Sequence, residues 1–194
     1  MKILSREFYS QETTFVARKL LGKCLVRKIN DIILSGTIIE TEAYRSDDPA
    51  SHTYIGITER NKVMFGEVGR AYVYTIHGIH NCIDVVARNS RFDAGGVLIR
   101  AIVPQKGIET MMRNRNFTHL KNLTNGPAKI TQALQITKKH YGIDLTKDSE
   151  LFIAEGNQHD QEIMARSRIG IKKGQDKMWN YRIDMTDREE NHFC

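Results

Sequence analysis

Apolar side chains that alternate with polar ones, interrupted by turn-forming clusters, mark most of the secondary structure predicted for this chain. Asn30-Asp31 separates two such runs and predicts a hairpin, and Gly78 lies between the two strands of a second one. Together the runs predict strands at residues 24–29, 32–44, 71–77, 81–87, 96–103, 150–155 and 180–185.

Helical periodicity occurs near the start and in the middle of the chain. Residues 10–23, SQETTFVARKLLGK, predict an amphipathic helix with Ser10 as its N-cap and Gly22 at its end. Further helices are predicted at about 106–115 and about 127–139. Strands thus come first, helices follow and strands return, an order typical of the α+β class.

We therefore predict one α+β domain over residues 1–194, with flanking helices on a curved, mostly antiparallel sheet. A chain of 194 residues is long enough for one well-buried domain and short for two. Neither a linker nor an internal repeat is visible in the sequence.

The net charge of +6 is concentrated in one segment. Residues 106–140 hold seven Lys and Arg residues against the single acid Glu109, which gives that segment alone a charge of +6. Such a concentration fits a polyanion as the partner, nucleic acid first. A basic, solvated surface without a partner gives the same count, so charge alone leaves both interpretations open.

Targeting signals are not visible in the sequence. Arg6 and Glu7 interrupt the N-terminus before a signal-peptide core could form, and no apolar run approaches the about 18 residues of a membrane span. The three cysteines include no CxxC pair, and their small number fits a reducing compartment. We expect no membrane segment and an intracellular location, in the cytoplasm or nucleoid of a bacterium or the nucleus of a eukaryote.

Glu40, Glu42 and Tyr44 raise the first question of chemistry. A strand alternates its side chains between two faces, so these three residues and Ile38 are predicted on one face. If exposed, the two carboxylates form an ordinary solvated edge; if buried, they need partners or one takes up a proton. Arg100, in the middle of an apolar strand, must likewise be paired or line a cleft.

A second group of reactive side chains lies between residues 72 and 84. Its possible metal ligands are His77, His80, Cys82 and Asp84. The chain has no second cluster of the kind that zinc sites with signature spacing require, so we predict no metal. Cys82 lies in an apolar run, where a cysteine is usually a small core residue and not a nucleophile.

Short motifs follow one another along roughly residues 5–185. They are ARKLLGKCLVR, GTIIETEAY, SH at 51–52, RNKVMF at 60–65, GRAYVY, VLIRAI, NGPAKITQAL and RIGI at 168–171. Each is unspecific alone, but in this order and at these spacings the set resembles the alkyladenine DNA glycosylases, also called 3-methyladenine or methylpurine DNA glycosylases.

The resemblance implies a base-excision-repair enzyme whose fold is like that of formyltransferase C-terminal domains. Such an enzyme flips alkylated or deaminated purines, of the 3-methyladenine, 7-methylguanine and hypoxanthine class, out of duplex DNA and hydrolyses the N-glycosidic bond, which leaves an abasic site. The resemblance also implies that the enzyme is a monomer and that it acts on damaged double-stranded DNA without a metal or other cofactor. No lysine accompanies the strand motif, so a lyase step is not expected.

The resemblance also implies catalytic roles. Glu42 resembles the general base that activates a water, and Arg100 resembles the arginine that helps to hold this water. Ile169 falls where the family directs a main-chain carbonyl at the same water. Glu40 is expected to be structural and paired with a lysine or arginine.

Five further positions match base-binding or intercalating residues of the family. Tyr44 resembles the aromatic residue that stacks on one face of the extruded base, and His52 and Tyr74 resemble those that close over the other face. His77 replaces an intercalating tyrosine, and we expect it to be the wedge. Asp84 replaces an asparagine that helps to exclude guanine; it would relax that exclusion if ionised and change specificity little if protonated or paired.

Two other functions fit parts of the sequence. A non-catalytic nucleic-acid-binding module would share the basic charge and the fold. A metal-dependent nuclease would need Mg²⁺ in a tight geometry of acids, for which the candidates are Glu40, Glu42, Asp47 and Asp48.

Overall fold

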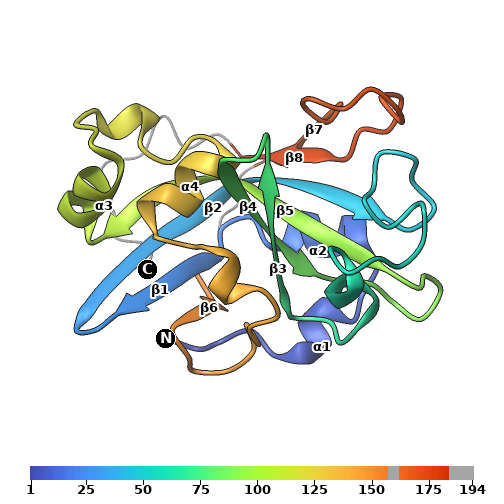
Figure 1. Cartoon of the computed structure of the whole chain (residues 1–194), viewed down its shortest axis with the longest axis horizontal. Helices are drawn as coiled ribbons and strands as arrows, with labels where there is room; N and C mark the ends of the chain where they lie inside the picture. The colour runs from blue at the N-terminus through green and yellow to red at the C-terminus, as the bar shows by residue number, and fades with distance from the viewer. Residues whose placement is uncertain (157–161, 184–194) are drawn as a thin grey trace.

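The structure is built on one curved sheet whose strands come from both ends of the chain (Figure 1). The computed structural model describes residues 1–156 and 162–183. Within these residues the sheet has eight strands, in the order β3-β4-β5-β2-β1-β6, with β8 beside β2 and β7 beside β8, and all of its pairings are antiparallel. The strands are β1 (Cys24–Ile29), β2 (Ile32–Arg45), β3 (Ala71–Ile76), β4 (His80–Val86), β5 (Gly95–Lys106), β6 (Leu151–Ala154), β7 (Met164–Arg166) and β8 (Asn180–Arg182).

Strand β2 is the longest of these strands and has three neighbours. β5 pairs along one side of it over nearly its whole length. On the other side, β1 pairs with residues 32–37 and β8 pairs with residues 40–42. Glu40 and Glu42 therefore lie in the interior of the sheet and not on a solvated edge.

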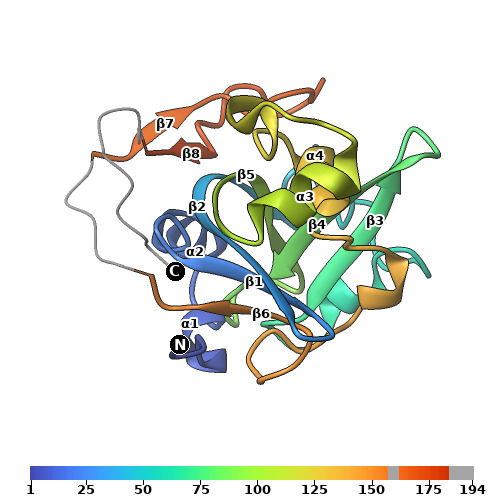
Figure 2. The same cartoon turned by 90° about the vertical axis from the view of Figure 1, so that its left-hand side faces the viewer.

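Short helices pack on this sheet (Figures 1 and 2). α2 contacts β2 and β5, and the Thr41 hydroxyl donates to the Ala17 carbonyl of α2 at 2.8 Å. α4 contacts β4 and α3. No helix in the described part of the chain is long and apolar enough to cross a bilayer. The helices are α1 (Arg6–Tyr9), α2 (Thr13–Lys19), α3 (Ile108–Arg115) and α4 (Pro127–Ala133), with 3₁₀ turns η1 (Lys62–Phe65), η2 (Leu120–Asn122) and η3 (Lys138–His140).

The apolar side chains divide between the two faces of the sheet. Along β5, Val97 and Ile99 belong to the main core with α2, whereas Leu98 belongs to a smaller cluster with Tyr72 and Cys82. This division follows from the alternation of side chains along a strand. It confirms an α+β structure with a curved antiparallel sheet; the likeness to formyltransferase domains stays a prediction.

Most predicted elements are confirmed, with corrections at their ends. Asn30 has a positive φ of 51° in the predicted turn between β1 and β2. The predicted cap Ser10 is wrong, because Glu12 is the N-cap of α2 and its carboxylate accepts from the amides at residues 14 and 15. α4 ends at Ala133, not near 139, and Gln135 just beyond has a left-handed φ of 51°. Residues 184 and 185, the end of the last predicted strand, lie outside the described residues.

The predicted face of Ile38 is also wrong. The pairing of β2 with β5 shifts register between Ile38 and Glu40, as at a β-bulge, and again before Thr41. Ile38 consequently packs in the main core with Ala43, while Glu40 shares its basic partner with Glu42 on the opposite face. The irregularity interrupts the alternation that the sequence alone suggests.

Candidate active site

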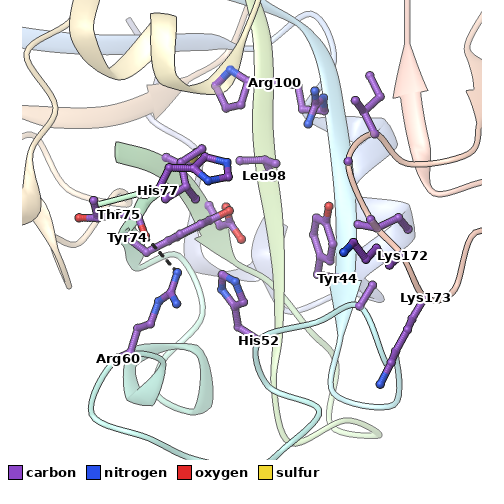
Figure 3. Close-up of a pocket in the computed structure, with 18 of the residues that line it drawn as sticks. Tyr44, His52, Arg60, Tyr74, Thr75, His77, Leu98, Arg100, Lys172 and Lys173 are labelled. Atoms are coloured by element: carbon purple, nitrogen blue, oxygen red, sulfur yellow. Dashed lines mark hydrogen bonds between the residues drawn. The ribbon is translucent and has the colours of Figure 1, made fainter. Parts of the chain in front are cut away.

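A cavity of about 700 Å³ opens on the face of the sheet that carries the smaller apolar cluster (Figure 3). Its volume falls in the range typical of small-molecule sites. Besides the strands, two loops line it, one through Pro49 and His52 and one through residues 169–173. Six of the seven predicted site residues line this cavity, namely Tyr44, His52, Tyr74, His77, Asp84 and Arg100.

Glu42, the seventh, lies beneath the cavity floor with no exposed surface. Its Oε2 accepts from the Tyr44 hydroxyl at 2.8 Å and from the Arg100 guanidinium at 3.2 Å. Its Oε1 accepts from the Ile169 backbone amide at 2.7 Å and from the Asn180 side-chain amide at 3.1 Å. These four donors replace water around a buried carboxylate. Three of them line the cavity, so the carboxylate lies directly beneath its surface.

Glu40 shares two of these donors. Its Oε1 accepts from Arg100 Nε at 3.3 Å and from Asn180 Nδ2 at 2.8 Å. The predicted pairing of Glu40 with a basic residue is therefore confirmed. Arg100 and Asn180 each join both acids, and this fixes the two carboxylates relative to each other.

Tyr44 forms one wall of the cavity. The Arg168 guanidinium lies 4.7 Å from the centre of its ring, as in a cation–π contact, and the same ring lines the cavity. Burial, together with the charge of Glu42 and the bond to it, raises the pKa of the Tyr44 hydroxyl well above its ordinary value. The hydroxyl therefore stays protonated and acts as a donor to Glu42.

A buried ion pair holds the loop behind Tyr44 in place. Arg168 and Asp48 have no exposed side-chain surface, and both terminal nitrogens of Arg168 donate to Asp48. Arg168 also donates to the Ala43 carbonyl at 2.9 Å and to the Gly174 carbonyl at 3.2 Å. This pair fixes the position of Ile169, the next residue, whose amide contacts Glu42. The main-chain carbonyl role of Ile169 stays a prediction.

The opposite wall is an aromatic cluster. Tyr72 and Tyr74 stack with ring centres 4.7 Å apart, and the His52 ring meets Tyr74 edge-on at 4.8 Å. His52 Nδ1 lies 3.0 Å from the Tyr72 hydroxyl. Burial of the His52 ring and the positive charge of Arg60 both disfavour the protonated ring, and they lower the pKa of His52 to about 4. The ring is therefore neutral at pH 7. Figure 3 shows His52 and Tyr74 across the cavity from Tyr44.

Basic side chains flank the mouth of the cavity (Figure 3). Arg60 lies 5.5 Å from the centre of the Tyr74 ring and donates to the Thr75 carbonyl at 3.2 Å. Lys172 and Lys173 lie on the other side, beside Tyr44. An anionic ligand would therefore meet positive charge on both sides of the opening.

Cys82 and Asp84 lie side by side in the cavity wall on β4. Burial, together with the charge of Asp84, raises the pKa of the Cys82 thiol to about 12, so it carries no thiolate at neutral pH. Asp84 is 3% exposed, and its Oδ1 has no hydrogen-bond partner among the described residues. His80 lies 3.4 Å from the Gln132 side chain on α4, so the alternative that pairs His80 with Asp84 is not realised.

His77 lies at the tip of the β3–β4 hairpin, beside the cavity mouth. His77 and Gly78 have positive φ values of 49° and 75°, the conformation that tight hairpin turns require. Ile79, the next residue, is 75% exposed. The tip thus projects a planar ring and an apolar side chain, but its role as a wedge stays a prediction.

The acids considered for a metal-dependent nuclease are each paired with an arginine. Arg100 contacts Glu40 and Glu42. Arg45 pairs with Asp47, and Asp48 is buried against the guanidinium described above. No group of three or more His, Cys, Asp or Glu side chains within the described ranges is arranged to hold a metal ion.

Sequence reasoning missed three contributors to this site. They are Arg168, the first residue of the RIGI motif, Asn180 in a short strand, and the backbone amide of Ile169. No periodicity identifies such residues, since they reach Glu42 or Tyr44 only through chain segments more than 100 residues away. The one sequence feature that could have pointed to Arg168 is its position directly before the apolar residues of the RIGI motif.

A family model and several known proteins resemble this chain over most of its length. A family model described as "Methylpurine-DNA glycosylase" matches residues 7–187. A protein of Carboxydothermus hydrogenoformans named "Putative 3-methyladenine DNA glycosylase" is 43% identical over 180 residues, which cover 92% of this chain and 94% of that protein. Proteins with the same name from Clostridium acetobutylicum (43% over 196 residues, 94% of each chain) and Desulfitobacterium hafniense (41% over 197 residues, 95% of this chain and 96% of that protein) are also similar.

Proposed function

The chain belongs to the methylpurine-DNA glycosylase family, and from this premise we propose that it removes alkylated or deaminated purines from double-stranded DNA. The damaged nucleotide is extruded into the cavity, and hydrolysis of its N-glycosidic bond leaves an abasic site. The substrates are purines of the 3-methyladenine, 7-methylguanine and hypoxanthine class.

One observation carries the proposal: Glu42 lies, fully ordered by four donors, directly beneath a cavity with aromatic walls. An extruded purine fits between Tyr44 on one side and His52 with Tyr74 on the other. Stacking of a base on an aromatic side chain is worth roughly 1–3 kcal/mol and tolerates any purine. The walls therefore bind the base, while other groups carry out hydrolysis.

Glu42 acts as the general base in this proposal. Breaking the bond between base and sugar develops positive, oxocarbenium-like charge on the sugar. A water reaches Glu42 at Oε2, in place of the Tyr44 or Arg100 bond, and gives up its proton as it attacks the sugar. Arg100, which lines the cavity, orients this water. Cationic alkylated purines already carry the charge that makes them leave.

His77 is proposed to fill the space that the extruded nucleotide vacates. Its position at the hairpin tip beside the cavity mouth supports this role. A planar imidazole can stack between base pairs, and the exposed Ile79 adds apolar surface next to it. We further propose that the protein acts as a monomer, in the nucleoid if the source is bacterial.

Lys172 and Lys173 are proposed to contact the phosphates of the extruded nucleotide. With both changed to Ser, the slope of log binding constant against log salt concentration should become shallower by about 1 for each lysine, because each phosphate contact releases counterions. Fluorescence anisotropy with a labelled duplex at several salt concentrations measures this slope. Changing Lys2 and Lys147 to Ser, neither of which lines the cavity, should leave the slope unchanged.

The proposed function predicts excision in the presence of EDTA. A labelled duplex with one 7-methylguanine or hypoxanthine should become alkali-sensitive at that position, while the strand stays intact without alkali. Released base and alkali-sensitive sites should appear in equal amounts. Binding without alkali-sensitive sites would identify a binding module, and complete inhibition by EDTA would identify metal-dependent cleavage.

A further inference from the structure

We propose that Asp84 is the proton donor to the departing base, which lets the cavity release neutral purines as well as cationic ones. This assignment rests on the proposed function, since it concerns the same reaction in the same cavity. It adds an acid opposite Glu42, the proposed base. Cationic alkylated purines leave without such help, so the two substrate classes depend on Asp84 differently.

The sheet register places the two carboxyl groups on opposite sides of one residue. Asp84 on β4 and Glu42 on β2 both pair with Leu98 on β5. Directly paired residues of neighbouring strands project to the same face, and neighbouring strands lie about 4.8 Å apart. The two α-carbons are therefore about 10 Å apart across one row of the sheet. Two acids separated in this way can serve as acid and base to a group between them.

The environment of Asp84 leaves one oxygen for a ligand. Asp84 lines the cavity although it is 3% exposed, and its Oδ1 has no partner within the described residues. Its Oδ2 lies beside Gly96, where an added Cβ would come within 3.5 Å of it. Buried polar atoms in native proteins almost always have a partner. A base in the cavity is the partner that this geometry provides.

Asp84 carries a proton at neutral pH. Burial, with a smaller effect of the Glu42 charge, raises the pKa of Asp84 to about 8, against an opposing effect of the Tyr74 hydroxyl. The other titratable groups that face Asp84 are poorer proton donors. Burial raises the pKa of four of them far above 8, so they hold their protons: Tyr44, Tyr72, Tyr74 and Cys82. Burial lowers the pKa of His52 to about 4, so its ring has no extra proton to give at neutral pH. The basic groups of the neighbouring elements are already engaged: Arg100 of β5 with Glu40 and Glu42, Lys129 of α4 with Asn125, and Lys62 of η1 with Glu59.

The protons balance in the proposed step. The bond between the sugar C1′ and the purine N9 breaks, and the electron pair leaves with the base. Asp84 transfers its proton to a ring nitrogen of that base and becomes a carboxylate. The water oxygen bonds to C1′ and its proton passes to Glu42. Loss of that proton to solvent and uptake of one by Asp84 restore the starting state.

Asp84→Asn tests the assignment, because the amide keeps the shape and can donate a hydrogen bond but cannot transfer a proton. Single-turnover release is measured from two duplexes, one with hypoxanthine and one with 7-methylguanine, between pH 5.5 and 9.5. For the unchanged protein, we expect hypoxanthine release to fall as the pH rises above about 8. The variant should release hypoxanthine about 100-fold more slowly at pH 7 and lack this alkaline decline.

Release of 7-methylguanine is the internal control. It should fall far less than hypoxanthine release in Asp84→Asn, because a cationic base leaves without a transferred proton, and the release that remains shows that the variant is folded and binds DNA. Equal losses on both duplexes, or an alkaline decline that persists in the variant, would overturn the assignment. Failure of the unchanged protein to release either base would overturn the proposed function as a whole.

Discussion

Glu42→Gln should release damaged bases at least about 100-fold more slowly than the unchanged protein while binding the same duplex with similar affinity. Glutamine keeps the size of the side chain but cannot accept the proton of the attacking water. The walls formed by Tyr44, His52 and Tyr74 are unaffected, so the base can still be held. Single-turnover release gives the rate, and fluorescence anisotropy gives the dissociation constant.

Glu40→Gln is the matched control for this experiment. Glu40 lies on the same strand, and it accepts from the same two donors, Arg100 and Asn180. It has no contact with Tyr44 or Ile169 among the described bonds, so we assign it no part in proton transfer. Its substitution should therefore slow release far less. If both variants lose the same activity, the arrangement of Arg100 matters and the base is not Glu42.

Asp48→Asn should lower the free energy of unfolding by about 3–5 kcal/mol, the largest stability effect that we expect from a single substitution here. The change leaves the Arg168 guanidinium without its carboxylate in a position that has no exposed surface. Lys177 lies 3.4 Å from Asp48 and would add a second unpaired charge. Urea unfolding at pH 7, followed by circular dichroism, measures the difference.

The same substitution should also slow base release, because Arg168 supports the Tyr44 ring and the loop that brings the Ile169 amide to Glu42. Asp47→Asn is the control. The Asp47 carboxylate is next to Asp48 in the sequence, but it is 48% exposed and pairs with Arg45. Exposed ion pairs contribute about 0–1 kcal/mol. Similar stability of the two variants would mean that the buried pair contributes no more than a surface pair.

Asp84→Asn should raise the free energy of unfolding at high pH, whereas Asp48→Asn lowers it. A carboxyl group whose pKa is raised in the folded state stabilises the fold less as the pH rises from its unfolded pKa towards about 8. The amide does not titrate, so the stability difference between the two proteins should grow in favour of the variant over that range. This dependence separates an effect of Asp84 on folding from its effect on base release.

The sequence by itself determined most of the local elements and which residues are candidates for the site. Alternation marked the strands, Asn30 marked the first hairpin, and the order of motifs identified the family. It also predicted that Arg100 would be paired or line a cleft, and that Glu40 would have a basic partner; Arg100 does both. These properties depend on residues near one another in the chain or on the cost of burying a charge, so they can be read locally.

Only the tertiary structure decided which face and which partners each acid has. The irregular pairing near Glu40 separates Ile38 from the acids, and periodicity does not reveal it. Arg168 and Asn180 reach the site from the far end of the chain. The burial of Asp84 depends on the position of β4 between β3 and β5. Long-range packing fixes these features because burial and hydrogen bonding depend on neighbours in space, which a local pattern of residues does not specify.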